Sequence, residues 1–415
     1  MTPLPSSDLV IDDFPAQGRW LRISMVTETY PPEVNGVART VASVVDGLRA
    51  RGHELQLIRP NQHRGDEASS DGRFHEVLMR GLPIPRYPQL RLGMATRQSF
   101  LRIWSRRRPD VVHIATEGPM GWAALQAARQ LRIPVCSDFR TNFHAYSQHY
   151  GIGWLHKPIM AYLRKFHNQT GCTTTPDAGL RQTLTNLGMR NVIVVARGVD
   201  SQLFNPQRRS PELRAEWGVG PQDIAVVHVG RMAPEKNLDA LVVAFEAIER
   251  AQPSARLVLV GDGPSSRELQ RRLPRAIFAG MRHGTDLAAH YASGDLFLFP
   301  SLSETYGNVT AEALASGLPV AAFNYAAAGQ LVRNGVNGAV VPMADTPAFV
   351  HAACQLTSDV NALRQMGQAA RQGAEQLGWD RIIDQIEGVY HKLIAGRAVE
   401  EAAQPAFTAG TLAVD

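Results

Sequence analysis

Short apolar runs alternate with amphipathic stretches along most of the chain, and this alternation predicts a succession of strands and helices. Residues 21–28 (LRISMVTE) form the first predicted strand. Valines and leucines then recur at intervals of three and four up to Gly52, which predicts a helix that ends there. After a strand at 54–60 and a long polar loop, further strands are predicted at residues 111–114, 134–139, 171–176 and 191–199, with a helix over 118–131.

Residues 202–223 interrupt this pattern, because they are rich in Pro, Gly and charged side chains, as linkers are. The alternation then restarts, with predicted strands at 224–230, 256–261, 276–280, 296–300 and 319–324 and helices over 238–250 and 309–316. Two such series predict an α/β protein with two Rossmann-like, doubly wound parallel sheets. The predicted organisation is a flexible extension (1–19), an N-terminal domain (20–203), a C-terminal domain (204–377), a final helix (378–396) and a flexible tail (397–415).

Composition narrows the class of protein. The 415 residues are 44% hydrophobic and 20% charged, which is typical of a globular chain, and no apolar run approaches the roughly 20 residues of a membrane span. The acidic N-terminus does not resemble a secretory signal. Three scattered cysteines (Cys136, Cys172 and Cys354) give no metal spacing and no disulfide framework, so we expect a cytoplasmic protein.

Charge is divided unevenly along the chain. Residues 1–200 hold 25 Lys and Arg against 16 Asp and Glu, whereas residues 201–415 hold 18 against 22. A basic half indicates an anionic partner for that half, although a solvated basic surface would have the same composition.

The loop after the predicted strand 224–230 carries the first candidate site. Gly230 ends the strand, Arg231 and Lys236 follow, and a helix begins near residue 238. Two cations beside a helix N-terminus, with its unpaired N–H groups, favour a diphosphate. A polar surface loop could hold the same residues.

A second candidate site follows the strand at 296–300. Glu304 comes just after the strand, and Glu312 lies in the next helix, so the two carboxylates would stand at different depths of one cleft. Glycine at position 307 allows a ligand to approach the backbone closely. The turn that opens this helix consists of Tyr306, Gly307 and Asn308, and the backbone N–H groups of Gly307, Asn308 and Val309 could bind phosphate. Each glutamate could instead be a helix-surface charge.

The N-terminal half offers two further groups of candidates. Gly36 begins a helix after a Pro-Pro loop and would let a phosphate or sugar approach the N–H groups there. Polar groups also follow the strands at 111–114 and 134–139 and are predicted to line the mouth of this domain: His113, Glu117, Arg140, Asn142 and His144. Any single histidine could equally be structural.

Several motifs are absent from the sequence. No G-x-G-x-x-G follows the first strand of either half, which argues against a dehydrogenase, and no G-x-x-x-x-G-K-[ST] loop occurs. No Asp-x-Asp is present, so a diphosphate would be held by Arg231 and Lys236 rather than by a metal ion.

At these residues the chain resembles the retaining glycosyltransferases of family 4, over roughly residues 20–395. The most specific elements are the two glutamates with seven residues between them, Glu304 and Glu312, and the Gly230-Arg231 pair with Lys236. The segments TETYPPEVNGVART and TNFHAYSQHYG look most like bacterial GDP-mannose-dependent α-mannosyltransferases and glycolipid glycosyltransferases.

The resemblance implies a GT-B fold, in which an acceptor-binding N-terminal domain and a donor-binding C-terminal domain face each other across a cleft and the last helix crosses back. It implies transfer with retention, without a metal, in which Arg231, Lys236 and Glu304 act on the donor. Glu304 would bind the donor sugar and Glu312 the ribose, Gly36 would lie against the distal phosphate, and residues 279–282, with Arg282, would face the base. Two departures leave the donor sugar open, since family members often have His at the position of Arg140 and Glu at that of Gln330.

Residues 86–108 combine seven arginines with bulky apolar residues, including Phe100, Ile103 and Trp104. Such a mixture suits an anionic membrane surface, although the apolar residues could instead pack the helix onto its domain. No nucleic-acid motif accompanies these charges. We therefore expect a peripheral enzyme on the inner membrane face with a lipid or lipid-linked acceptor; a soluble sugar acceptor and a non-catalytic nucleotide-sugar-binding protein are the alternatives.

Overall fold

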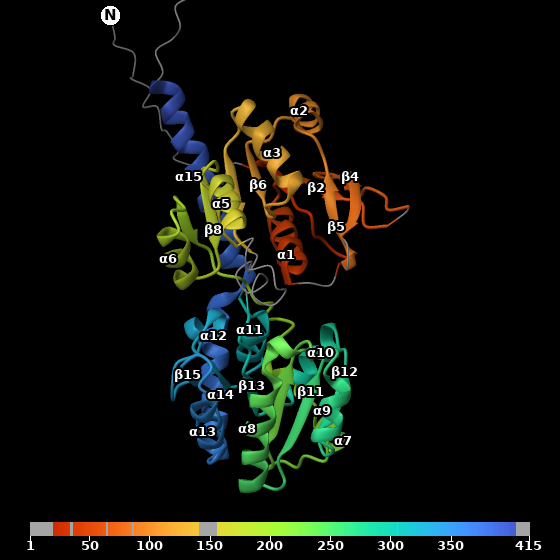
Figure 1. The fold of residues 1–415 in the computed structure, drawn as a ribbon, viewed down its shortest axis with the longest axis vertical. Coiled ribbons are helices and arrows are strands. Elements are labelled where there is room, and N and C mark those ends of the chain that lie inside the picture. Colours follow the sequence, from red (N-terminus) through yellow and green to blue (C-terminus); the bar gives the residue numbers. More distant parts are fainter. Residues whose placement is uncertain are drawn as a thin grey trace, which may run out of the picture.

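The computed structural model describes residues 20–33, 36–63, 65–84, 87–140, 156–304 and 306–403. These residues form two lobes, one above the other in Figure 1, each built around a largely parallel sheet. The extension predicted at residues 1–19 lies outside the described residues.

The N-terminal lobe contains a sheet in the order β3-β4-β2-β1-β6-β7-β8-β9, with β5 antiparallel to β4. Its strands are β1 (Arg22–Val26), β2 (Glu54–Pro60), β3 (Ser70–Asp71), β4 (Phe74–Ile84), β5 (Tyr87–Met94), β6 (Val111–Ile114), β7 (Val135–Asp138), β8 (Cys172–Thr175) and β9 (Val192–Val194). The helices are α1 (Gly36–Ala50), α2 (Arg97–Arg106), α3 (Pro119–Gln130), α5 (His156–His167) and α6 (Ala178–Asn186).

The C-terminal lobe contains a parallel sheet in the order β12-β11-β10-β13-β14-β15. Its strands are β10 (Ala225–Val229), β11 (Arg256–Val260), β12 (Ile277–Gly280), β13 (Leu296–Phe299), β14 (Val320–Phe323) and β15 (Gly338–Val341). The helices are η2 (Pro206–Arg208), α7 (Pro211–Glu216), η3 (Pro234–Lys236), α8 (Leu238–Ala251), α9 (Ser266–Arg272), α10 (Gly284–Ala292), α11 (Asn308–Ala315), α12 (Ala326–Leu331), α13 (Thr346–Thr357), α14 (Val360–Ala374) and η4 (Glu375–Leu377).

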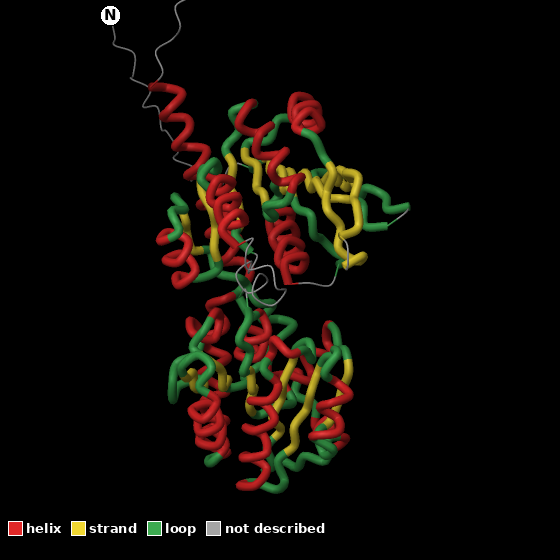
Figure 2. Tube along the Cα trace, viewed as in Figure 1, coloured by secondary structure: helices red, strands yellow, loops and turns green. Residues whose placement is uncertain are grey.

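Both sheets are covered by helices on both faces (Figure 2), which explains why their strands are apolar runs rather than alternating ones. In β10, Val227 packs into the core on one face of the sheet and Val226 into the core on the other, and both are fully buried. This arrangement confirms the predicted pair of doubly wound α/β domains.

The final helix, α15 (Trp379–Ala403), leaves the C-terminal lobe and packs on α1 of the N-terminal lobe (Figure 1). Its Ile382, Ile383, Ile386 and Tyr390 belong to the same hydrophobic core as the strands β1 and β2. The helix runs to Ala403, beyond the end predicted at residue 396, and residues 404–415 of the predicted tail lie outside the described residues.

Two other predictions need correction. The long polar loop predicted before residue 111 contains β4, β5 and α2, and β4 extends the parallel sheet beside β2. The predicted linker 202–223 contains η2 and α7, and its Phe204, Trp217 and Val219 are buried in the core of the C-terminal lobe. Two of its three prolines start helices, because Pro206 and Pro211 occupy the first helical positions, where no N–H is needed.

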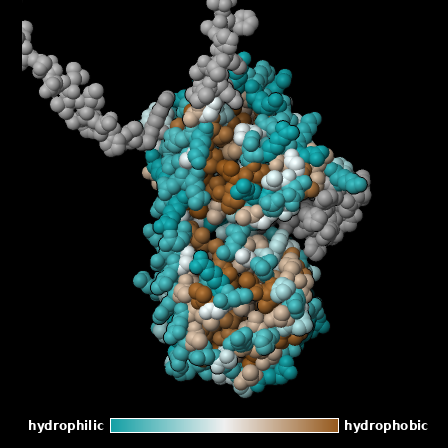
Figure 3. Space-filling view, turned by 90° about the vertical axis from the view of Figure 1, so that its left-hand side faces the viewer, coloured by the Kyte–Doolittle hydropathy of each residue, from teal (hydrophilic) through white to brown (hydrophobic). Residues whose placement is uncertain are grey.

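The chain crosses between the lobes twice, and the two crossings lie together. The Val199 N–H donates to the Leu377 carbonyl at 2.9 Å, and Val199 pairs with Gly378 in an isolated bridge. Seen from the side, apolar residues gather on the facing surface of each lobe (Figure 3).

Candidate functional site

The candidate site of the C-terminal lobe lies where the strand order reverses, between β10 and β13. These strands are neighbours in the sheet, and a polar loop follows each of them. Open α/β sheets bind ligands in the crevice outside such a point. Gly230 and Arg231 follow β10, and Glu304 follows β13, so the two candidate loops meet here.

Lys236 and Glu304 are in direct contact. The Lys236 Nζ forms an ion pair with Glu304 Oε1, and the same oxygen accepts a hydrogen bond from the Ser301 hydroxyl at 2.8 Å. The Tyr325 hydroxyl donates to the Glu304 backbone carbonyl at 2.9 Å and so fixes the loop. The side chains of Lys236 and Glu304 remain 17% and 15% exposed, which leaves both accessible to a ligand.

Arg231 lies in the same loop as Lys236 and is more exposed. Its guanidinium pairs with Glu235, and its side chain keeps 59% of its accessible surface. An exposed pair of this kind contributes little to stability, so Arg231 can exchange its partner for an anionic ligand at little cost.

The helix α11 presents its N-terminus to the same crevice. Gly307 adopts a left-handed conformation (φ 91°, ψ 61°) at the N-cap, which suits a residue without a side chain. The first N–H groups of the helix, at Asn308 and Val309, have no acceptor within it. Tyr306, just before the cap, is buried, and burial raises its pKa to about 12.

Glu312 lies deeper, one turn further along α11. Its Oε2 accepts a hydrogen bond from the Tyr291 hydroxyl at 2.9 Å. Burial raises the pKa of Glu312, although the Tyr291 hydrogen bond and the positive charge of Arg39, on α1 of the other lobe, lower it. The influence of Arg39 reaches Glu312 from across the interface between the lobes.

Gly36 brings the N-terminal lobe to the same point. A Cβ atom placed on Gly36 would lie 3.7 Å from Asn308 Nδ2 and 3.9 Å from Arg197 Nη1. The N-termini of α1 and α11 therefore approach each other. Arg197 was not among the residues singled out from the sequence; its signal is a lone arginine that follows the strand β9.

Arg282 lies at the edge of this region, after β12. Its Nε donates to the Ala279 carbonyl at 2.8 Å, and its Nη1 pairs with Asp286 Oδ2 at 3.0 Å. The side chain is exposed and held in place by the loop that it follows.

The residues predicted to bind the acceptor do not all lie together, and the prediction for His113 is wrong. His113 lies within β6 and is buried: Nε2 lies 2.9 Å from Asp138 Oδ1, and Nδ1 lies 2.5 Å from the Tyr390 hydroxyl. It therefore does not line the mouth of the lobe. Glu117 is also buried, with Oε1 3.4 Å from His167 Nε2. Asn142 and His144 lie outside the described residues.

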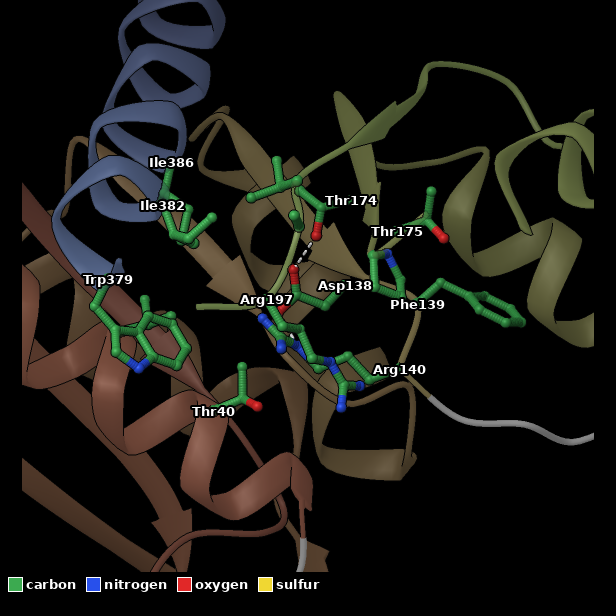
Figure 4. A pocket seen from close by; sticks show the side chains of 14 residues that line it. Thr40, Asp138, Phe139, Arg140, Thr174, Thr175, Arg197, Trp379, Ile382 and Ile386 are labelled. Atoms are coloured by element: carbon green, nitrogen blue, oxygen red, sulfur yellow. Dashed lines mark hydrogen bonds and ion pairs between the residues drawn. The ribbon is translucent and has the colours of Figure 1, made fainter. Parts of the chain in front are cut away.

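Arg140 lies closer to the interface between the lobes. Its Nε donates to Asp138 Oδ2 at 2.6 Å, and Figure 4 shows its guanidinium beside that of Arg197. Burial alone would raise the pKa of Asp138, but the neighbouring Arg140 and His113 hold it well below its usual range. Asp138 is therefore a carboxylate with several partners.

Two negative findings apply to the part of the chain that the structure describes. Within it, no group of three or more His, Cys, Asp and Glu side chains is arranged to hold a metal ion. None of its helices is both long enough and apolar enough to cross a lipid bilayer.

Two family models match this chain. The model described as Glycosyltransferase Family 4 matches residues 34–203, and the one described as Glycosyl transferases group 1 matches residues 223–359. The two matches correspond to the two lobes.

Curated relatives extend over most of the chain. The GDP-mannose-dependent alpha-mannosyltransferase of Mycobacterium tuberculosis is 34% identical, with 92% of this chain and 99% of that protein covered. The sulfoquinovosyl transferase SQD2 of Arabidopsis thaliana is 30% identical, with 86% and 71% covered. The alpha-monoglucosyldiacylglycerol synthase of Streptococcus pneumoniae is 26% identical, with 77% and 75% covered.

Solved structures have the same fold. Sucrose-phosphate synthase from Thermosynechococcus elongatus superposes with a TM-score of 0.73 at 18% identity and covers 90% of this chain and 100% of that one. HepE of Anabaena, solved in complex with UDP, gives 0.70 at 18% identity with the same coverage.

Proposed function

Given that the chain belongs to glycosyltransferase family 4 and has its GT-B fold, we propose that it transfers a hexose, with retention, from a nucleotide diphosphate sugar to a membrane lipid or lipid-linked glycan. GDP-mannose is the first donor to test. The observation that carries the proposal is the contact between Lys236 and Glu304 at the point where the strand order reverses.

Each group in the crevice has a role in this proposal. Lys236 and Arg231 bind the diphosphate, together with the N–H groups at the start of α11. Glu304 accepts hydrogen bonds from the hydroxyls of the sugar, and Glu312 from those of the ribose. Lys236 also fixes the Glu304 carboxylate, so that binding of the phosphate and of the sugar are coupled through one ion pair.

The chemistry then depends on the leaving group. As the bond between the sugar and the diphosphate breaks, negative charge grows on the phosphate oxygens, and the cations are already placed to stabilise it. The acceptor hydroxyl enters on the face from which the diphosphate leaves and gives its proton to the leaving phosphate. No protein nucleophile and no metal ion is required.

The donor and the acceptor are suggested by the relatives. GDP-mannose is part of the name of the mannosyltransferase at 34% identity, and diacylglycerol is part of the name of the synthase from Streptococcus pneumoniae. Arg140 and Gln330, the two departures noted in the sequence, leave UDP-glucose, UDP-galactose and UDP-glucuronic acid as donors to be compared.

The proposal includes attachment to the membrane through residues 86–108. Phe100 and Trp104 of α2 are fully buried, and the Trp104 indole donates to Ser24 Oγ at 3.1 Å, so neither can enter a bilayer. Arg97, Arg102 and Arg106 remain exposed, but α2 lies at the end of its lobe away from the C-terminal lobe (Figure 1). We therefore propose attachment by charge alone, at a site remote from the crevice.

The transfer is tested with the purified full chain, each labelled nucleotide sugar in turn, and a membrane lipid extract. The expected result is label in the lipid fraction with one donor and an α-linkage by NMR. Glu304→Gln, which retains the shape but not the charge, abolishes transfer, whereas the exposed control Glu67→Gln retains it. Label only in a water-soluble product would establish a soluble acceptor, and binding of the donor without turnover would establish a non-catalytic protein.

Attachment is tested by flotation with liposomes that contain phosphatidylglycerol. Binding that weakens with salt and is lost in Arg102→Glu with Arg106→Glu supports attachment by charge. Flotation that is unaffected by these changes would assign the membrane contact to another surface.

A further inference from the structure

Arg197 is a buried cation with little to bind. The residue is 5% exposed, and its Nε and Nη2 have no hydrogen-bond partner in the described structure. Its Nη1 reaches Asn308 Oδ1 at 3.4 Å, which is a long hydrogen bond, and its guanidinium lies 5.5 Å from the centre of the Tyr306 ring. Buried guanidinium groups normally have a carboxylate partner, because an unpaired buried charge is strongly destabilising.

The charged groups near Arg197 do not supply the missing negative partner. Figure 4 shows the side chains of Arg197 and Arg140 next to each other, with Asp138 close by. Asp138 is already engaged by Arg140, His113 and Thr174. Burial and the like charge of Arg140 lower the pKa of Arg197 to about 9. The region therefore has a surplus of positive charge that the described residues do not neutralise.

The position of Arg197 indicates which anion would neutralise it. The cavity that Arg197 and Arg140 line has a volume of about 20 Å³, room for about one water molecule, so a phosphate cannot enter it. Arg197 Nη1 lies 3.4 Å from Asn308 Oδ1, where α11 begins, and 3.9 Å from the position that a Cβ atom on Gly36 would take, where α1 begins. Both helix N-termini favour an anion at this point.

We infer that Arg197 is a third donor-binding cation, supplied by the N-terminal lobe, which contacts the distal phosphate of the nucleotide diphosphate sugar. The inference rests on the proposed function. The sugar is transferred to an acceptor on the N-terminal lobe, so the phosphate that carries the sugar is the one nearest to that lobe. Arg231 and Lys236 hold the diphosphate from one lobe and Arg197 from the other, so the donor itself links the lobes.

The test compares stability and nucleotide affinity in Arg197→Met. A cation without a partner is a cost to the ligand-free protein, so we expect the melting temperature of Arg197→Met to equal or exceed that of the wild type. Loss of a hydrogen bond to a charged group predicts that the Kd for GDP, or for UDP if the wild type prefers it, rises about ten-fold or more in calorimetry. The Kd for the matching nucleoside monophosphate, which lacks the distal phosphate, changes less than about two-fold. Arg197→Lys recovers part of the affinity.

Arg214→Met is the matched control. Arg214 is equally buried but fully paired, with Asp295 Oδ2 at 2.8 Å and three backbone carbonyls at 2.9 Å. We expect this variant to melt at a lower temperature and to bind the nucleoside diphosphate like the wild type.

Three results would overturn the inference. A lower melting temperature with unchanged diphosphate affinity would make Arg197 structural, and unchanged diphosphate affinity with a raised KM for the acceptor would assign the anion to the acceptor. Equal losses for the mono- and diphosphate would exclude the distal phosphate. Lys236→Ala distinguishes failure of this inference from failure of the proposed function. If Lys236→Ala abolishes diphosphate binding while Arg197→Met does not, only the inference fails. If the wild type binds no nucleoside diphosphate, the proposed function fails.

Discussion

The two lobes have the same central strand order, but the charged side chains at the point where that order reverses have different partners. In the C-terminal lobe, Lys236 and Glu304 meet at the surface of the crevice and stay partly exposed. At the corresponding point of the N-terminal lobe, between β1 and β6, Glu28 is half-buried, and its side chain accepts a hydrogen bond from the Met120 N–H at 3.0 Å. The strand order reverses in both lobes, and the residues at that point decide whether the charged groups there pair with each other or with the backbone of their own lobe.

This difference in partners predicts which substitutions affect ligand binding and which affect folding. Charged groups of the C-terminal crevice have partners that a ligand can replace, so their loss should affect binding and turnover. Charged groups of the N-terminal crevice are bound to the protein itself, so their loss should affect folding. Four substitutions test this division.

Lys236→Ala is expected to have the largest effect. Removing one preorganised cation from a developing phosphate charge lowers kcat by about 10²–10³, or about 3–4 kcal/mol. The melting temperature should change little, because the ion pair with Glu304 is partly exposed. Steady-state kinetics and thermal melts, with the exposed Lys392→Ala as control, measure both quantities. A variant that loses its fold along with its activity would contradict the division.

Glu28→Gln tests the N-terminal crevice through pH. Burial, together with the negative charge of Glu117, raises the pKa of Glu28 to about 7, although the Met120 N–H lowers it. Between the unfolded value of 4.5 and about 7, the folded state keeps a proton that the unfolded state loses, so this group makes the protein less stable as pH rises.

Glutamine accepts the same hydrogen bond without a charge, so Glu28→Gln should be more stable than the wild type by about 3 kcal/mol near pH 8 and equal to it near pH 4. Denaturant titrations at several pH values measure this difference. His228, whose pKa burial lowers to about 4, titrates identically in both proteins and cancels in the comparison. A stability difference that does not vary with pH would show that Glu28 is already ionised.

His113→Leu is expected to destabilise without affecting donor binding. The substitution removes a partner from both Asp138 and the Tyr390 hydroxyl, which are buried, at a cost of about 2–3 kcal/mol. Thermal melts with and without nucleoside diphosphate should show a lower melting temperature but an undiminished shift on adding the ligand. A diminished shift would return His113 to the ligand site.

Glu312→Gln is expected to have the smallest effect of the four substitutions, and this effect is on the KM for the donor. Glutamine retains the hydrogen bond from Tyr291 but presents a neutral oxygen to the ribose, so KM rises by about ten-fold, or about 1.4 kcal/mol. Stability should increase slightly, because burial raises the pKa of this carboxyl. Tyr291→Phe is the matched control, and an unchanged KM in Glu312→Gln would remove Glu312 from the donor site.

The sequence predicted the two sheets well because parallel strands covered on both faces are unbroken apolar runs, as at residues 224–230 and 256–261. It failed at β4, where Gly81 and Pro83 interrupt the run near its antiparallel end. It also misjudged residues 202–223, because prolines that begin helices look the same in a sequence as prolines that break them.

Some residues of the candidate site could be predicted from the sequence, and others could not. Lys236 and Glu304 could be brought together from the sequence because both follow strands whose ends must meet. His113 was misplaced because it lies inside its strand rather than after it. Arg197 was missed because its significance depends on what surrounds it, a buried place without an acidic partner, and the sequence does not reveal which charges remain unpaired after folding.

The two segments that connect the lobes lie side by side at Val199 and Gly378, so the lobes are joined along a single line. If one lobe rotated about these crossings, each atom would move in proportion to its distance from them. Arg197 is two residues from Val199, and its Nη1 lies 3.4 Å from Asn308 Oδ1 at the start of α11, so such a rotation would move Arg197 little. A donor bound to the C-terminal lobe would therefore find the proposed third cation at nearly the same place before and after such a rotation.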